Sequence, residues 1–257
     1  MCEVFAMNGT ALRRVNEELK EFYSHSDKHP NGWGLALLEP DMTNWEKEPL
    51  CANESRYLRE RLSEPIMARS VMAHIRYATI GNVEWRNCHP FCGRDRSGRQ
   101  WVFQHNGTIF DYPPLHPYVN VQQGDTDSER ILLYFLDRID RKMEESGHVL
   151  SKEERFRLLD GIVCDMAHGN KLNLVFFDGE LLYVHTNCRG TLHIRQEDGC
   201  VMFSTQPLSV GEWEPLAFMQ LLAYENGQPA FAGTKHDGEY VEDPEAVGQL
   251  YLAYSGL

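Results

Sequence analysis

The sequence predicts an α+β domain in which helices cover antiparallel sheets. Its later strands come in hairpins: residues 172–186 hold two apolar runs separated by Asp178-Gly179, and residues 191–205 repeat this arrangement around Asp198-Gly199. The candidate helices form a separate block that precedes these hairpins. Paired strands and segregated helices favour antiparallel sheets over an alternating parallel fold. No internal repeat or long linker divides the chain, so we expect residues 1–257 to form a single domain.

The first elements are a strand and a helix. Residues 2–7 are largely apolar on both alternating faces, which is typical of a strand buried inside a layered structure. Thr10 is predicted to cap a helix that begins directly after it. The apolar face of this helix would consist of Leu12, Val15, Leu19 and Phe22.

Three further strands and then two helices are expected before the hairpins. The strands are predicted at residues 31–39, 69–79 and 99–107. The first helix would begin at Thr126, with Glu129 completing a capping box, and the second at Ser151, with Glu154 in the same place.

Composition and charge exclude several classes of function. The chain has 257 residues, of which 42% are apolar and 25% are charged, as in ordinary globular proteins. Its net charge of −13 argues against nucleic acid or an anionic membrane surface as the main partner, because both require basic surface. No apolar run is long enough to span a bilayer, and the N-terminus lacks the pattern of a secretory signal.

The cysteines point to a reducing compartment. There are seven, an odd number at scattered positions, which predicts free thiols in a cytoplasmic protein. The one close pair, Cys88 and Cys92, encloses His89 and so offers three potential metal ligands. A structural zinc site needs four ligands, usually from two separated pairs, and no second pair stands out. We therefore expect no metal here.

Cys2 raises a question because it directly follows the initiator methionine. It could be a small buried thiol. It could also become the first residue of the mature chain, with a thiol and a free amine on neighbouring carbons. A catalytic thiol needs a base, and an α-amine has an ordinary pKa near 7.7–8.0.

Three other segments could carry chemistry, although each also has a structural explanation. Arg76 lies in an apolar strand pattern, where a guanidinium needs a carboxylate partner from a ligand or from the protein. Asn106-Gly107 could present two donors to an oxyanion, or could be a simple turn. Asp127 lies in the first turn of a capped helix, where free N–H groups favour an acid.

The order of these segments is more specific than any one of them. Cys2 is followed by His-Ile-Arg-Tyr-Ala-Thr (74–79), Asn-Cys-His-Pro-Phe (87–91), His-Asn-Gly (105–107) and Thr-Asp-Ser-Glu (126–129). This ordered set resembles the class II glutamine amidotransferases, which are N-terminal-nucleophile (Ntn) hydrolases. Pro-Asn-Gly-Trp-Gly-Leu-Ala (30–36) also resembles a loop of the small members that lack a synthase domain. The resemblance is strong over residues 1–130 and slight after residue 215.

The resemblance implies a fold and a set of roles. The fold would be a four-layer αββα sandwich of two antiparallel sheets. Cys2 would be the nucleophile, with its own α-amine as general base after removal of Met1. Asn106 and Gly107 would form the oxyanion hole.

The resemblance also implies how the substrate is held. Arg76 would bind the α-carboxylate of glutamine and Asp127 its α-ammonium group, and Tyr77 and Thr79 would contact the substrate as well. The larger synthase enzymes carry Trp at the position of Tyr77 and His at the position of Ile80. We expect His89 to have an architectural role.

The expected activity is hydrolysis of the side-chain amide of glutamine or of another γ-glutamyl amide through a thioester, with no cofactor. Ammonia would be released or passed to an acceptor on a separate synthase subunit, and the oligomeric state stays open. The alternative is a non-catalytic regulatory subunit that binds glutamine or a γ-glutamyl compound and keeps the pocket without turnover.

Overall fold

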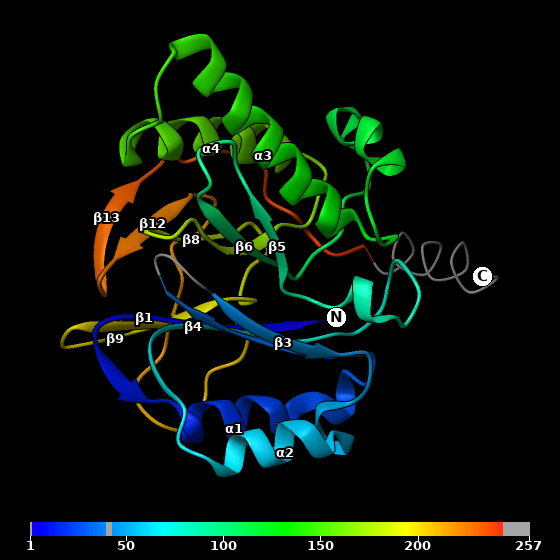
Figure 1. The fold of residues 1–257 in the computed structure, drawn as a ribbon, viewed down its shortest axis with the longest axis vertical. Coiled ribbons are helices and arrows are strands. Elements are labelled where there is room, and N and C mark those ends of the chain that lie inside the picture. The colour runs from blue at the N-terminus through cyan, green and yellow to red at the C-terminus, as the bar shows by residue number, and fades with distance from the viewer. Residues whose placement is uncertain (1, 40–42, 244–257) are drawn as a thin grey trace.

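Two antiparallel sheets lie face to face between two pairs of helices (Figure 1). This computed structural model describes residues 2–39 and 43–243. The arrangement is the four-layer αββα sandwich, so the predicted fold class is confirmed.

The first sheet has seven strands in the order β11-β9-β10-β1-β4-β2-β3. Their bounds are β1 Glu3–Arg14, β2 Trp33–Leu38, β3 Asn44–Glu48, β4 Met67–Ile75, β9 His193–Glu197, β10 Cys200–Ser204 and β11 Glu214–Pro215. Strand β1 lies at the centre and pairs with β10 on one side and β4 on the other.

The second sheet has six strands in the order β13-β12-β8-β7-β6-β5. Their bounds are β5 Phe91–Arg94, β6 Gln100–His105, β7 Asn173–Phe177, β8 Leu182–Thr186, β12 Leu222–Glu225 and β13 Gln228–Ala232. The two predicted hairpins are confirmed as β7–β8 and β9–β10, with Gly179 and Gly199 at positive φ in their turns.

Within the residues that the structure describes, four α-helices form the outer layers. Helices α1 (Asn16–Ser24) and α2 (Arg56–Ser63) cover the first sheet, and α3 (Asp127–Ser146) and α4 (Lys152–Met166) cover the second (Figure 1). Short 3₁₀ helices occupy His25–Lys28, Ala52–Glu54, Trp85–Asn87 and Pro113–Asn120. None of the helices in the described part of the chain combines the length and apolar character that crossing a membrane requires.

Three apolar cores hold these layers together. On β1, Phe5 and Met7 pack toward α1 and α2, whereas Val4 and Ala6 pack between the two sheets. The third core lies between the second sheet and helices α3 and α4. The prediction that residues 2–7 form a strand buried on both faces is therefore confirmed.

The predicted helix start at Thr10 is wrong. Strand β1 continues to Arg14, because its second half pairs with the beginning of β4 after an irregularity in register between Asn8 and Arg13. Leu12 is consequently exposed on the strand, and α1 begins only at Asn16. Long-range pairing here overrides the local helical spacing.

The two central helices begin as predicted. The Thr126 side chain accepts a hydrogen bond from the Glu129 N–H, and Ser151 and Glu154 form a reciprocal capping box. Each cap supplies a partner for N–H groups that the first helical turn leaves free. The cap at Thr126 also fixes where Asp127 lies, as the first residue of α3.

Candidate active site

The predicted site residues converge at one end of the sandwich. Cys2 directly precedes β1, whose Glu3 is paired with Ile75 at the end of β4, so Arg76 lies close to Cys2 in the next register position. Asn106 directly follows β6 in the opposite sheet. The candidate site therefore lies where the ends of both sheets meet, and Asp127 at the start of α3 is near enough for its charge to raise the pKa of the Cys2 thiol.

The Cys2 thiol contacts the backbone of Tyr77. Its Sγ lies 3.4 Å from the Tyr77 carbonyl oxygen and accepts a hydrogen bond from the Tyr77 N–H at 3.3 Å. Burial raises the pKa of the Cys2 thiol, and this effect exceeds the opposing ones of the Tyr77 N–H and the Arg76 charge. A thiol in this position depends on a nearby base to become a nucleophile.

Asn106 and Gly107 follow β6 in a tightly packed turn. The Asn106 N–H donates to the Asn173 carbonyl at 2.9 Å, while its buried side-chain Oδ1 has no hydrogen-bond partner among the described residues. A Cβ at position 107 would lie 2.0 Å from the carbonyl oxygen of Lys171. Only glycine fits there, so the residue next to Asn106 is fixed by packing.

Arg76 is buried and organises the loop that follows it. Its guanidinium donates to the carbonyl oxygens of Ile80, Gly81 and Asn82 at 2.8–3.0 Å. Its backbone N–H donates to the Gly32 carbonyl at 2.7 Å. Arg76 therefore makes hydrogen bonds to the backbone of this loop, in addition to any contact with a ligand.

Asp127 is buried at the N-terminus of α3. Its Oδ2 accepts from the Ile109 N–H at 2.8 Å and its Oδ1 from the Ser128 N–H at 2.8 Å. A carboxylate has about four acceptor positions, so lone pairs remain for a ligand. Thr79 is half-buried in the loop held by Arg76.

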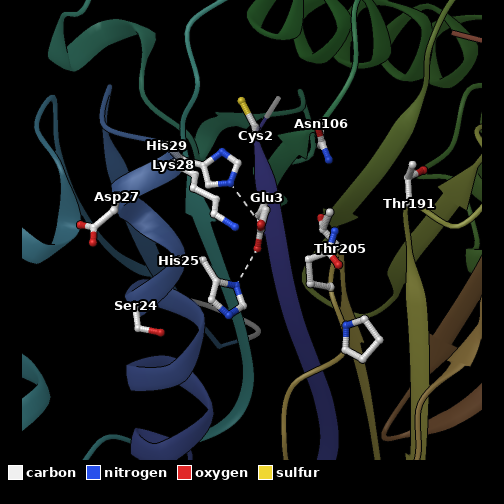
Figure 2. A pocket seen from close by; sticks show the side chains of 12 residues that line it. Cys2, Glu3, Ser24, His25, Asp27, Lys28, His29, Asn106, Thr191 and Thr205 are labelled. Atoms are coloured by element: carbon white, nitrogen blue, oxygen red, sulfur yellow. Dashed lines mark hydrogen bonds and ion pairs between the residues drawn. The ribbon is translucent and has the colours of Figure 1, made fainter.

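A cavity of about 850 Å³ opens beside Cys2 and Asn106 (Figure 2). Its further lining comes from β1, the α1–β2 connection and the loops near β9 and β10: Glu3, Ser24, His25, Asp27, Lys28, His29, Thr191, Thr205, Gln206 and Pro207. The cavity brings together Cys2 and Asn106 of the predicted residues. Arg76, Tyr77, Thr79, Gly107 and Asp127 are not among its lining residues.

Sequence reasoning missed the charged group in this cavity. Glu3 follows Cys2 in the chain, and its carboxylate contacts His25 Nδ1 at 2.9 Å and His29 Nε2 at 3.1 Å. Both histidines come from the 3₁₀ helix after α1 and its end. No local sequence pattern indicates this cluster, because it forms through a tertiary contact between β1 and the 3₁₀ helix after α1.

Segment 30–36 packs closely against the residues around the site. A Cβ on Gly34 would lie 1.9 Å from the His89 carbonyl oxygen, so β2 and the segment after Cys88 touch through their backbones. The Asn31 side chain accepts from the Ala78 N–H at 3.0 Å and so steadies the residues beside Tyr77.

His89 and Cys88 are packed in the interior, and Cys92 is half-buried. The His89 ring stacks on His74 with centroids 4.0 Å apart, and His89 is almost wholly buried. Burial raises the pKa of Cys88 to about 11 and that of Cys92 to about 12. Within residues 2–39 and 43–243, no three or more His, Cys, Asp or Glu side chains are arranged so that they could hold a metal ion.

This chain is similar in sequence or in fold to several known proteins. Residues 1–198 match the family model of the class II glutamine amidotransferases. An uncharacterized protein of Methanocaldococcus jannaschii is 29% identical over 262 residues, an alignment that covers 91% of this chain and 72% of that protein.

Two solved structures show the same fold. A predicted glutamine amidotransferase from Pseudomonas aeruginosa aligns with a TM-score of 0.64 at 21% identity, over 89% of this chain and 99% of that one. The glutamine phosphoribosylpyrophosphate amidotransferase of Bacillus subtilis aligns with a TM-score of 0.65 at 15% identity, over 89% of this chain but only 48% of that enzyme. The family model, which spans well over half of the sequence, establishes that the chain belongs to the class II glutamine amidotransferases.

Proposed function

We propose that this protein hydrolyses the side-chain amide of glutamine or of a related γ-glutamyl amide, with Cys2 as the nucleophile. The observation that carries the proposal is the position of the Cys2 thiol, which contacts the Tyr77 backbone and opens with Asn106 onto one cavity. A nucleophile and an oxyanion donor that face one space are what acyl transfer requires.

The α-amine of Cys2 supplies the base in this proposal. Met1, whose removal would free that amine, lies outside the described residues. The amine takes the thiol proton as Sγ attacks the amide carbon, and it gives that proton to the departing nitrogen when the C–N bond breaks. The products of this half-reaction are a thioester on Cys2 and ammonia or an amine, and water then releases glutamate.

The remaining predicted residues stabilise the tetrahedral intermediate and bind the substrate. Asn106 and the Gly107 N–H stabilise the oxyanion of the tetrahedral intermediate. Arg76 and Asp127 bind the α-carboxylate and the α-ammonium group, which are the two opposite charges of an amino-acid head group. Tyr77 and Thr79 complete the substrate contacts from the loop after β4.

The size of the cavity supports a substituent on the amide nitrogen. About 850 Å³ lies next to Cys2, which is far more than departing ammonia needs. Because Arg76 and Asp127 would read only the glutamyl head group, γ-glutamyl amides of larger amines also belong to the proposed substrate class. Transfer of the released ammonia to a separate synthase subunit is compatible with the same chemistry.

The Cys2→Ala variant tests the proposal. We expect the wild-type protein to form ammonia and glutamate in equal amounts from glutamine, or an amine and glutamate from a γ-glutamyl amide, and the variant to form neither. Cys164→Ala is the matched control, since this half-buried thiol lies on the outer helix α4 and should leave activity unchanged. Full activity of Cys2→Ala would refute the proposal.

The mass of the intact protein tests the role of the α-amine. We expect natively expressed protein to lack Met1 and to carry Cys2 as its first residue. A retained Met1 together with tight glutamine binding and no turnover would instead favour the regulatory-subunit alternative.

A further inference from the structure

Glu3 lies at the centre of a charged cluster inside the cavity beside Cys2. It accepts from His25 Nδ1 through Oε2 and from His29 Nε2 through Oε1 (Figure 2). Glu3 and His29 are each more than nine-tenths buried, whereas the His25 side chain keeps 28% of its exposure. The other charged groups at this cavity are Asp27 and Lys28.

The contacts of Glu3 fix the tautomer of His29. Burial would raise the pKa of Glu3, but hydrogen bonds from His29 and His25 outweigh it and lower that pKa. An ionised carboxylate can only accept hydrogen bonds, so the Nε2 of His29 must carry the proton. The Nδ1 of neutral His29 is therefore a proton acceptor.

This Nδ1 has no hydrogen-bond partner among the described residues, although it is buried. Buried polar atoms in native proteins almost always have partners, so an unpaired one indicates a ligand or a reactive role. The His29 ring lies edge-on to the ring of Tyr77, with centroids 6.5 Å apart, and the Tyr77 backbone contacts the Cys2 thiol. Figure 2 shows the ring between the Glu3 carboxylate and the end of β1 that carries Cys2.

We propose that His29, held by Glu3, is the proton acceptor for the water that hydrolyses the thioester on Cys2. This inference rests on the proposed function and adds a second base to it. The α-amine handles the proton of the thiol, and His29 handles the proton of the water. The leaving group, which is ammonia or an amine, departs on the same side of the acyl group on which the water enters. The cavity that His29 lines adjoins Cys2.

The step balances without another reactant. The water oxygen forms a bond to the thioester carbon while one water proton moves to His29 Nδ1. The C–S bond then breaks, which releases glutamate and leaves the Cys2 thiolate, and the thiolate takes the proton from Nδ1. The Glu3 carboxylate stabilises the imidazolium that exists between these two transfers.

Pre-steady-state kinetics of His29→Gln tests this role. Ammonia reports formation of the thioester and glutamate reports its hydrolysis, so quenched-flow measurement of both separates the two half-reactions. We expect thioester formation at the wild-type rate and hydrolysis slowed about 100-fold, the scale of a lost general base. A burst of ammonia equal to the protein concentration and a γ-glutamyl adduct in the intact mass should accompany it.

Two further measurements separate chemistry from folding. Hydroxylamine attacks thioesters with little need for a base, so it should restore turnover of His29→Gln by forming the γ-glutamyl hydroxamate. Glu3→Gln should show a smaller defect in the same half-reaction, because its amide no longer fixes the His29 tautomer. His148→Gln is the control, since His148 also pairs with a glutamate, Glu154, but lies at the surface before α4.

The outcomes are distinct. Hydrolysis of the thioester at the wild-type rate by folded His29→Gln would overturn the inference, and so would a defect confined to thioester formation in either folded variant. If wild-type protein forms neither ammonia nor a covalent adduct, the proposed function itself fails. Thermal unfolding of each variant identifies any that is not folded, and Glu3→Gln then decides alone if His29→Gln does not fold.

Discussion

Cys2 and Cys88 show that burial alone does not make a thiol catalytic. Burial raises the pKa of both, to about 11 for Cys88, so neither is a strong nucleophile by itself near neutral pH. What distinguishes Cys2 is that it lines the cavity, and the proposed mechanism gives it its own α-amine as a base. Cys88 instead lies against the carbonyl oxygens of Glu48 and Glu84.

The charge of Asp127 should matter for substrate binding. We expect Asp127→Asn to raise KM for glutamine by at least about tenfold with a smaller change in kcat, because a buried charge-assisted hydrogen bond to an ammonium is worth about 1.5–3 kcal/mol. The amide keeps the acceptor for the Ile109 N–H, so the loop after β6 should stay in place. Steady-state kinetics with glutamine measures both constants.

Asp125→Asn is the control for this substitution. Asp125 lies two residues earlier, is exposed, and accepts from the Asn87 side chain at 3.2 Å. It should change KM little, since solvent screens an exposed charge. Equal KM values for Asp127→Asn and wild type would show that the charge of Asp127 does not contribute to glutamine binding.

At the scale of elements, the contact between β2 and the segment after Cys88 determines the position of the loop beside the site. We expect Gly34→Ala to destabilise the protein by about 3 kcal/mol or more, because the added methyl would meet the backbone oxygen of His89. Activity should fall with it, since β2 also pairs with β4, which ends immediately before Arg76. Chemical denaturation measures the change in free energy of unfolding.

Gly161→Ala is a matched glycine substitution with the opposite expectation. Gly161 is exposed within α4, and a Cβ there would contact nothing within 4 Å. Alanine should therefore stabilise the protein by about 0.5–1 kcal/mol through its better helix propensity. A Gly34→Ala protein as stable as wild type would show that the two backbones can separate at low cost.

Local signals predicted some elements of this fold and missed others. The hairpin turns at Gly179 and Gly199 and the helix caps at Thr126 and Ser151 depend on a few neighbouring residues, so the sequence was sufficient to predict them. The length of β1 depends on pairing with β4, some 60 residues away, and the helical spacing around Leu12 misled the prediction.

The same distinction holds in the site. Of the residues that the ordered segments predicted, Asn106 lines the cavity beside Cys2 and Tyr77 contacts its thiol through the backbone, while the roles of all of them stay predictions. The Glu3–His25–His29 cluster lies outside those segments, and its members come from β1 and from the 3₁₀ helix after α1 with its C-cap. Its existence follows only from how α1 packs on the first sheet.

On the scale of the whole molecule, two sheets that pack face to face place Cys2 of the first opposite Asn106 of the second. The core between the sheets is apolar around Val4 and Val102 but carries buried imidazoles near the site. His74 and His89 stack there, and His185 is wholly buried on β8. These groups couple the stability of the fold to pH.

These histidines predict that acid destabilisation begins above the pH range in which carboxylates titrate. Burial lowers the pKa of His74 and of His185 to about 3, and that of His89 well below its ordinary value of 6.5. Between pH 6.5 and 3 the unfolded chain therefore binds protons that the folded chain does not, so stability is full above pH 6.5 and falls as pH decreases. Each group should contribute up to about 1.4 kcal/mol per pH unit.

Urea unfolding at pH 7.5, 6 and 5 measures this slope, and His185→Gln should reduce it. His148→Gln should not, because Glu154 raises the pKa of that exposed histidine, and its loss makes the decline slightly steeper. A free energy of unfolding that stays constant from pH 7.5 to 5 would mean that these imidazoles bind protons in the folded protein over the same pH range as in the unfolded chain.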